Sequence, residues 1–188
     1  MTSRINILLF VLIGILNSCM QTNKTTQSSY NKIISKFEQW RQEQHEIGTY
    51  EKEVNCNYEY VSKEGYKGTG IGMPRDIQLY YSNINSDTIM DALICFNPYL
   101  CDGGNALMNS QEKILILSKG QEYTVDERTL REIEGKLNSG WLYIHSVVGG
   151  TFIGEFQAYA KDDGRCCPSI QKRFNISYTD KSIKYFEN

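Results

Sequence analysis

The sequence predicts an α+β domain, in which an N-terminal amphipathic helix packs on a mainly antiparallel sheet and disulfides staple the fold. Apolar residues recur at helical spacing near the N-terminus. Short segments rich in Tyr, Ile, Val and Phe follow, separated by Gly, Asn, Asp and Ser turns. Most of these segments adjoin without a helix of crossover length between them, which favours antiparallel pairing.

The predicted helix covers residues 30–46. Its apolar stripe has helical spacing and consists of Tyr30, Ile33, Ile34, Phe37 and Trp40. Ser28 or Ser29 can cap its start and Gly48 can end it. We expect this stripe to contact the core rather than a partner protein.

The predicted strands are short and lie at 56–62, 76–82, 89–97, 112–118, 141–148, 151–160, 170–178 and 182–186. Gly149 and Gly150 fit a tight hairpin turn between two of them, and residues 129–137 fit one short helix. In 141–147, alternation places Trp141, Tyr143, His145 and Val147 on one face, and Leu142, Ile144 and Ser146 on the other. Apolar groups on both faces predict that this strand is central in its sheet.

The composition is that of an ordinary soluble domain. The chain has 188 residues, of which 40% are hydrophobic and 22% charged. A net charge of −2 provides no broad basic field, so we expect no nucleic-acid partner. The chain is too short for a TIM barrel or a propeller.

The N-terminus predicts a lipoprotein signal peptide over residues 1–18. Arg4 precedes a short apolar run that is too short to span a bilayer. The run ends in Leu16-Asn17-Ser18-Cys19, which resembles a bacterial lipobox, and this resemblance implies lipidation of Cys19. The alternative is an ordinary secretory signal followed by a chance cysteine.

Residues 19–29 then form the lipidated cysteine and a flexible Gln/Thr/Asn/Ser-rich tether, and residues 30–188 form a single domain. Met20 stands where the enterobacterial inner-membrane retention signal has aspartate. By analogy, we expect a cell-envelope protein held in the outer membrane by its lipid anchor, since two or more acyl chains bind membranes firmly.

Five cysteines remain after Cys19, namely Cys56, Cys95, Cys101, Cys166 and Cys167. An oxidising compartment favours disulfides, but five cysteines form at most two, and the sequence leaves the pairing open. We expect Cys101 to pair with Cys166 or Cys167, because these lie in loop-like segments, and Cys56 to pair with Cys95. The leftover thiol is either a buried small hydrophobe or a reactive group.

One acidic loop is a calcium candidate. Asn83, Asn85, Asp87 and Asp91 place oxygen ligands at alternate positions and end in a carboxylate, as short Ca²⁺ loops do. The loop resembles those of integrin-like and dockerin-like modules, but it lacks their leading carboxylate and their glycine. The alternative is a polar turn whose side chains bond their own backbone.

Two segments carry a resemblance to a wider group. The first runs from Asn83 to Ala106 and includes Asp91-Ala-Leu-Ile94 and Cys101-Asp-Gly-Gly-Asn-Ala106, and the second is Asp162-Asp-Gly-Arg-Cys-Cys-Pro-Ser169. Together they resemble a set of uncharacterised secreted or lipidated bacterial proteins, notably from Bacteroidota. The resemblance implies a secreted, disulfide-bonded domain and supplies no catalytic residues.

Catalytic sets are sparse. A thiol mechanism would combine Cys166 or Cys167 with His145 and either Asp102 or Asp163. Carboxylate-based cleavage would draw on Glu155, Asp162 and Asp163.

The glycines at 68–72 precede a strand rather than a helix, so they do not form a phosphate loop. The 13 tyrosines could form a sugar-stacking or protein-binding face, although β-propensity alone also explains them.

These observations favour a cell-envelope lipoprotein with a non-enzymatic binding or assembly domain, whose partner is an unidentified protein or glycan. The alternatives are a thiol- or carboxylate-dependent envelope hydrolase, or an immunity-type inhibitor lipoprotein.

Overall fold

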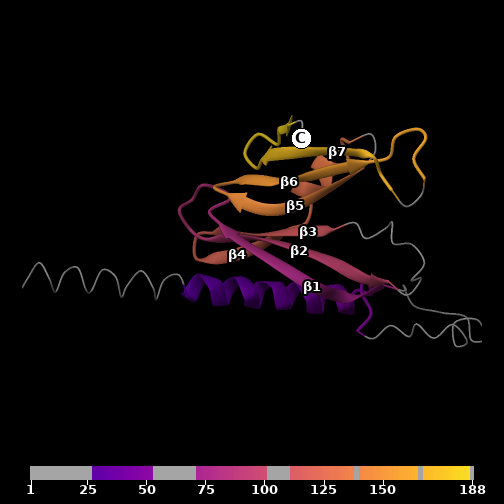
Figure 1. Cartoon of the computed structure of the whole chain (residues 1–188). Helices are drawn as coiled ribbons and strands as arrows, with labels where there is room; N and C mark the ends of the chain where they lie inside the picture. Colours follow the sequence, from indigo (N-terminus) through magenta and orange to yellow (C-terminus); the bar gives the residue numbers. More distant parts are fainter. Residues whose placement is uncertain (1–26, 53–70, 101–110, 138–139, 165–166, 187–188) are drawn as a thin grey trace, which may run out of the picture.

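The computed structural model describes residues 27–52, 71–100, 111–137, 140–164 and 167–186, which form three layers (Figure 1). A long helix over residues 27–46 lies on one face of a four-stranded sheet, and a second four-stranded sheet covers the other face. Both sheets are antiparallel, so the predicted α+β class is confirmed. The structure divides the strands between two sheets rather than one.

The first sheet has the order β1-β2-β3-β4 and the second the order β5-β6-β7-β8. The first comprises β1 (Ile71–Ser82), β2 (Asp91–Leu100), β3 (Glu112–Lys119) and β4 (Glu122–Asp126). The second comprises β5 (Trp141–Val148), β6 (Thr151–Ala158), β7 (Ile170–Ser177) and β8 (Ile183–Phe186), and the short helix α3 (Thr129–Glu134) joins the two sheets. Strand β4 was not predicted, and the predicted strand at 56–62 lies outside the described residues.

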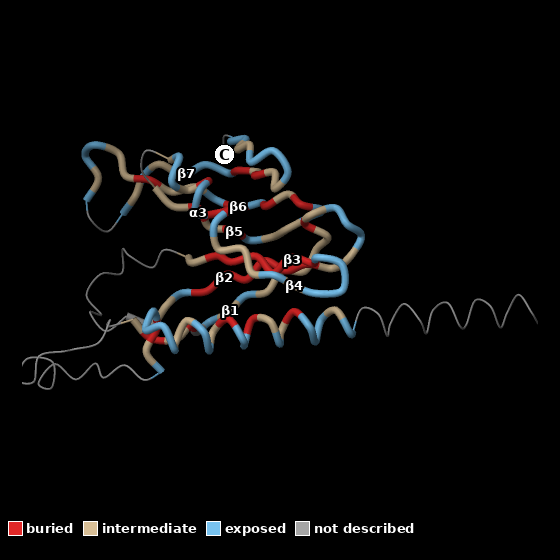
Figure 2. Tube along the Cα trace, turned by 180° about the vertical axis from the view of Figure 1, so that it is seen from behind, coloured by how far each residue is buried: buried red, intermediate tan, exposed pale blue. Residues whose placement is uncertain are grey.

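Strands β2 and β3 are buried on both faces, as Figure 2 shows by the red of their traces. Every residue from Asp91 to Phe96 and from Lys113 to Ser118 is buried. Because side chains alternate along a strand, one set faces the helix and the other faces the second sheet. This double burial explains why both segments are nearly continuous apolar runs.

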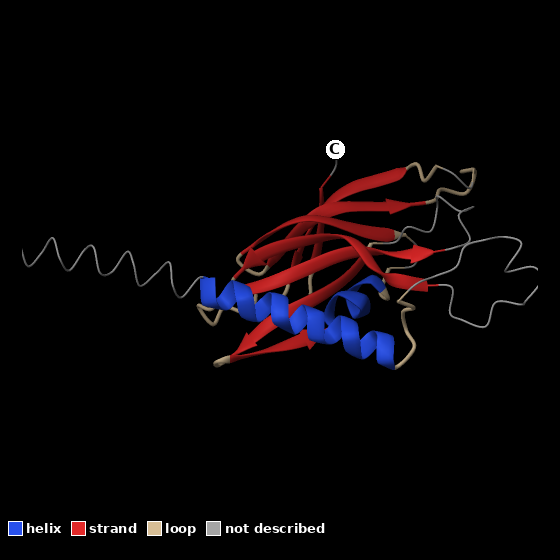
Figure 3. Ribbon diagram, turned by 90° about the horizontal axis from the view of Figure 1, so that it is seen from below, coloured by secondary structure: helices blue, strands red, loops and turns tan. Residues whose placement is uncertain are grey.

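The helix covers the outer face of the first sheet with the predicted stripe (Figure 3). Ile33, Phe37 and Trp40 are buried against Ile94 and Ile116. The Trp40 indole Nε1 also donates a hydrogen bond to Glu127, between β4 and α3. The expectation that this stripe serves the core is therefore confirmed.

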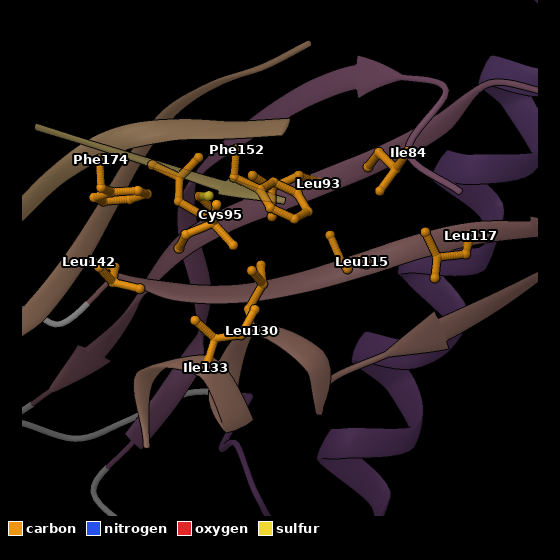
Figure 4. Close-up of a cluster of buried hydrophobic side chains, with 12 residues drawn as sticks. Ile84, Leu93, Cys95, Leu115, Leu117, Leu130, Ile133, Leu142, Phe152 and Phe174 are labelled. Carbon is orange, nitrogen blue, oxygen red and sulfur yellow. The ribbon is translucent and has the colours of Figure 1, made fainter. Parts of the chain in front are cut away.

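The second core lies between the two sheets (Figure 4). Leu93, Cys95 and Leu115 point from the first sheet toward Phe152 and Phe174 of the second. Helix α3 adds Leu130 and Ile133, which are also buried in this cluster.

Strand β5 is an edge strand, so the prediction that it is central is wrong. It pairs with β6 on one side, and on its other side the Gln111 side chain meets its backbone. Gln111 Oε1 accepts from the Ile144 N–H at 2.9 Å, and Gln111 Nε2 lies 3.4 Å from the Ile144 carbonyl oxygen. The amide thus takes the place of a neighbouring strand, which blocks an otherwise open edge.

The predicted two-glycine hairpin joins β5 to β6 and contacts the first sheet. Gly149 and Gly150 both have positive φ, and the Gly149 N–H donates to Ser82 Oγ at 2.8 Å. A Cβ atom on Gly150 would lie 2.6 Å from the Ile84 carbonyl oxygen. Only glycine therefore allows this close approach.

The expected disulfide between Cys56 and Cys95 is wrong, because the Cys95 thiol is buried in the core between the sheets and forms no disulfide. Cys95 is 1% exposed and lies among Leu93, Leu115 and Phe174. Cys95 therefore acts as a buried small hydrophobic side chain, which was one of the two roles expected for an unpaired cysteine. No disulfide is found among the described residues, and Cys19, Cys56, Cys101 and Cys166 lie outside them.

We predict that Cys95 resists alkylation in the folded protein. Burial raises the pKa of its thiol to about 12, and the reactive thiolate is correspondingly scarce at neutral pH. A Lys119→Cys variant, whose new thiol is exposed on the neighbouring strand β3, should react at least about a hundredfold faster. Peptide mapping after timed iodoacetamide treatment measures both rates, and unfolding in urea should abolish the difference. Rapid labelling of native Cys95, or a Cys95 disulfide in the map, would contradict this placement.

Candidate functional site

The outer face of the second sheet is the principal candidate site. The helix covers the first sheet, whereas no described helix lies over the outer side of β5–β8 (Figures 1 and 3). We call this surface the open face. The strand register places on it side chains that alternate with the buried ones, namely Trp141, Tyr143, His145, Ile153, Glu155, Gln157, Gln171, Arg173, Asn175, Lys184 and Phe186.

Aromatic rings cluster at one end of the open face. The Trp141 and Tyr159 rings meet edge to face, with centroids 5.4 Å apart and planes at 82°. Tyr143 lies two residues beyond Trp141 on the same face of β5. Burial chiefly, and the nearby Tyr159 hydroxyl in addition, raise the pKa of the Tyr143 phenol. These three side chains form what we call the aromatic cluster.

Planar polar side chains continue the rows that begin at the cluster. In one row, Trp141 pairs with Gln157, which pairs with Gln171. In the next, Tyr143 pairs with Glu155, which pairs with Arg173. Two amides, one carboxylate and one guanidinium thus lie beside the rings on neighbouring strands.

His145 occupies a bulge in β5, between Ile144, which pairs with Gly154, and Ser146, which pairs with Ile153. Its Nε2 atom lies 3.9 Å from Glu155 Oε2, and both side chains are about half exposed, at 56% and 50%. An exposed contact of this length contributes little to stability. It places an imidazole beside the carboxylate on the open face.

Among the described residues, no hydrogen bond or ion pair joins the proposed catalytic residues His145 and Asp163, and Cys167 is exposed. Asp163 accepts hydrogen bonds from the Ala160 and Ser169 backbone N–H groups at 2.6 and 2.8 Å, which hold its pKa below the usual value. Asp163 follows the end of β6 that pairs with Trp141, whereas His145 lies four residues further along β5, and four residues of strand span roughly 13 Å. The contact of Glu155 is with His145 rather than with a second carboxylate. Asp162 is exposed in the same loop as Asp163, and Asp102 and Cys166 lie outside the described residues.

The calcium candidates form a hydrogen-bonded turn. Asp91 is completely buried, and one of its oxygens accepts from the Ile84 and Asn85 N–H groups at 2.7 and 3.1 Å. Its other oxygen accepts from the Ser118 N–H at 2.7 Å and from the Ser118 hydroxyl at 2.6 Å. The loop between β1 and β2 is thereby fastened to the end of β3.

Asp87 is an exposed part of the same turn. It accepts from the Ile89 N–H at 2.9 Å and from Asn85 Nδ2 at 3.1 Å, and it contacts the Ser118 hydroxyl at 2.7 Å. Desolvation opposes ionisation of Asp87, but the hydrogen bonds together outweigh it and lower the pKa of this carboxyl. Asn83 keeps one buried amide oxygen without a protein partner. In the part of the chain that the structure describes, no group of three or more His, Cys, Asp or Glu side chains could hold a metal ion.

A polar cavity of about 440 Å³ lies between the long helix and the start of β1. Its lining comes from one helix face and two short segments, namely Glu38, Arg41, Gln42, His45, Lys52, Met73 and Pro74. Four of its charged or polar lining groups already have partners, including Gln42, whose Nε2 donates to Glu46 Oε1 at 2.9 Å. Arg41 contacts both Glu38 carboxylate oxygens at 3.0 Å, and His45 Nδ1 lies 3.1 Å from the Tyr50 carbonyl oxygen.

Sequence reasoning found part of the open face and missed the rest. Alternation placed Trp141, Tyr143 and His145 on one side of a strand, as observed. Its placement of Val147 on that side and of Ser146 on the other is wrong, because the bulge after Ile144 reverses the alternation, so that Val147 packs against the core and Ser146 pairs with the exposed Ile153. Gln157, Gln171 and Arg173 could not be assigned beside them, because the pairing of β6 and β7 sets those positions. The cavity was also missed, although Glu38, Arg41, Gln42 and His45 have the spacing of one helix face.

Comparison with known proteins gives no match, whether to a family model, to a curated protein or to a solved structure. Within the described ranges, no helix is long and apolar enough to cross a membrane.

We predict that Asp91→Asn lowers the free energy of unfolding by at least about 2 kcal/mol. Both carboxylate oxygens of Asp91 accept hydrogen bonds from backbone N–H groups, and the NH₂ group of asparagine would place a donor against some of these donors. The exposed Asp162→Asn is the matched control and should change stability by no more than about 0.5 kcal/mol. Urea denaturation measures both. Adding calcium to the unmutated protein should leave the midpoint unchanged, because protein donors already occupy the Asp91 oxygens. A large calcium-dependent rise would show instead that the folded loop binds the ion.

Proposed function

We propose that this chain is a lipid-anchored cell-envelope protein whose domain binds a partner on the open face and carries out no chemistry of its own. The observation that carries the proposal is the asymmetry of the two sheets. The first sheet is covered on both sides, whereas the second presents clustered aromatic and polar side chains on a side that no other described element covers. Aromatic side chains with polar tips are typical of surfaces that bind partners.

The arrangement of charged groups supports binding over catalysis. A thiol mechanism needs a nucleophile, a base and an orienting acid within hydrogen-bond reach. His145 contacts Glu155 on the open face, and Asp163 bonds backbone N–H groups in a loop beyond the sheet. A nucleophilic set centred on His145 would therefore have to include groups other than Asp163.

The proposed anchor leaves the open face accessible. The helix that follows the tether belongs to the layer on one side of the molecule, and the open face lies on the opposite side (Figure 1). A lipid on Cys19 would attach ahead of this helix. The first sheet and the helix would thus carry the connection to the membrane, and the second sheet would carry the binding surface.

We also propose two disulfides among the four cysteines that remain when Cys19 is lipidated and Cys95 is buried, namely Cys56, Cys101, Cys166 and Cys167. In Figure 1, β2 ends at the same end of the sandwich as the loop between β6 and β7 begins. We propose a bridge from Cys101 to Cys166 or Cys167, and Cys56 would then pair with the other. An oxidising envelope compartment would maintain both bridges.

The test combines anchoring with crosslinking in the cell envelope. Cys19→Ala should abolish incorporation of labelled fatty acid and release the protein from membranes, whereas Thr22→Ala in the tether should retain both. In the lipidated protein, a photo-crosslinking residue at Ile153 or Gln171 should give adducts of defined composition. The same residue at Gln42, on the helix, is the matched control and should give none.

Two results would contradict the proposal. Fatty-acid labelling that persists in Cys19→Ala would show that Cys19 is not the lipid anchor. The open face would be rejected as the binding surface if neither Ile153 nor Gln171 gave adducts, or if Gln42 gave equally many.

A further inference from the structure

We infer that the open face binds a neutral glycan chain, with the aromatic cluster as its stacking platform. This inference rests on the proposed function, because it names the chemical class of the partner for that surface. Three features support it, namely the rings of Trp141, Tyr143 and Tyr159, the polar rows beside them and the balance of charge around them.

The aromatic cluster provides partly exposed apolar rings that are held in place by packing. Trp141 and Tyr143 are half-buried, and Trp141 packs against Tyr159 with ring centroids 5.4 Å apart. Side chains supported in this way lose little conformational entropy on binding. A pyranose ring has an apolar face of C–H groups, and the negative face of an aromatic ring attracts such weakly positive hydrogens.

The polar side chains beside the aromatic cluster can hydrogen-bond the hydroxyl groups of a sugar. Gln157 and Gln171 each offer a planar amide that donates and accepts hydrogen bonds, Glu155 accepts only, and Arg173 donates only. Two adjacent sugar hydroxyls are close enough for one planar side chain to form a hydrogen bond with each of them. Because the two rows run across β5, β6 and β7, they present such groups along a line about 10 Å long.

The charges around the aromatic cluster favour a neutral ligand. Glu155 and Arg173 are cross-strand neighbours of opposite sign, and the amides of Gln157 and Gln171 carry no charge. A nucleic-acid strand would also stack on aromatic rings, but it requires a positively charged groove. The chain as a whole has a net charge of −2.

The surface is also poorly suited to a tightly packed protein interface. The core of such an interface is apolar and depleted in charged residues. Glutamine, glutamate, arginine and histidine side chains lie beside the rings of the aromatic cluster. The exposed apolar side chains Ile153 and Phe186 do not join them, because they lie at different positions on the sheet. A polyhydroxylated chain satisfies this mixture of rings and planar polar groups.

The two tryptophans of the chain allow a direct binding assay. Trp40 is buried beneath the helix at 4% exposure, so changes in fluorescence on adding a ligand to the open face report Trp141. The mature protein would be titrated with soluble neutral polysaccharides, namely laminarin, xylan, galactomannan and glycogen, and with alginate as an acidic comparison. We expect at least one neutral polymer to shift the emission and to protect Trp141 from acrylamide quenching.

Affinity electrophoresis through the same polymers tests the residues. Trp141→Ala should weaken retardation at least about tenfold, as truncation of a central aromatic contact does. Gln157→Ala should also weaken it, whereas Tyr30→Ala, which removes an exposed aromatic from the helix, should not. Urea denaturation of each variant establishes that it folds, and Gln157→Ala tests the site if Trp141→Ala does not.

No retardation by any neutral polymer, or equal retardation of Trp141→Ala and the unmutated protein, would overturn the inference, as would binding to alginate alone. Failure here is distinguishable from failure of the proposed function. Crosslinks from Ile153 or Gln171 to a protein, without glycan binding, would retain the open face as a binding surface and reject the glycan. Absence of any adduct would reject both.

Discussion

Strand β2 needs cover on both sides, because every side chain from Asp91 to Phe96 is buried. The helix supplies one cover through Phe37 and Trp40, and the second sheet supplies the other through Phe152 and Phe174. A strand with apolar residues at consecutive positions is unstable in a two-layer fold, where one face would meet water. The three-layer arrangement therefore follows from the composition of β2 and β3.

Polar groups fix how the layers meet. Asp91 fastens the loop after β1 to Ser118 at the end of β3. Lys113, which is buried, pairs with Glu134 of α3 at 2.7 Å, and Glu134 also lies 3.3 Å from the Leu142 N–H of β5. A buried charge costs free energy unless it is paired and hydrogen-bonded, so these contacts hold one relative placement of the sheets rather than add much stability.

The long helix and most strands could be predicted because their signals are local. Helical spacing of Ile33, Phe37 and Trp40 is visible in the sequence, and the Gly149-Gly150 turn marks its hairpin directly. Strand β4 could not be found so easily, since it is a five-residue edge strand with acidic ends that covers little of the core.

The errors concerned partners distant in the chain. The outward apolar side chains of β5 belong to the aromatic cluster of an uncovered face, which no single-strand pattern distinguishes from a central position. Cys95 and Cys56 were both expected in strands and hence as a pair, but the Cys95 side chain faces the core between the sheets. The placement of Gln157, Gln171 and Arg173 beside Trp141 and Tyr143 likewise depends on strand register, which is set by long-range pairing.

The first sheet is enclosed, whereas no described element covers the outer side of the second. Amide hydrogen exchange of the purified protein, resolved by strand, tests this difference most directly. Strands β2 and β3 should exchange only on global unfolding, whereas the four-residue edge strand β8 should open locally and exchange faster. Equal protection of β8 and β2 would contradict this difference, because the second sheet would then be enclosed as thoroughly as the first.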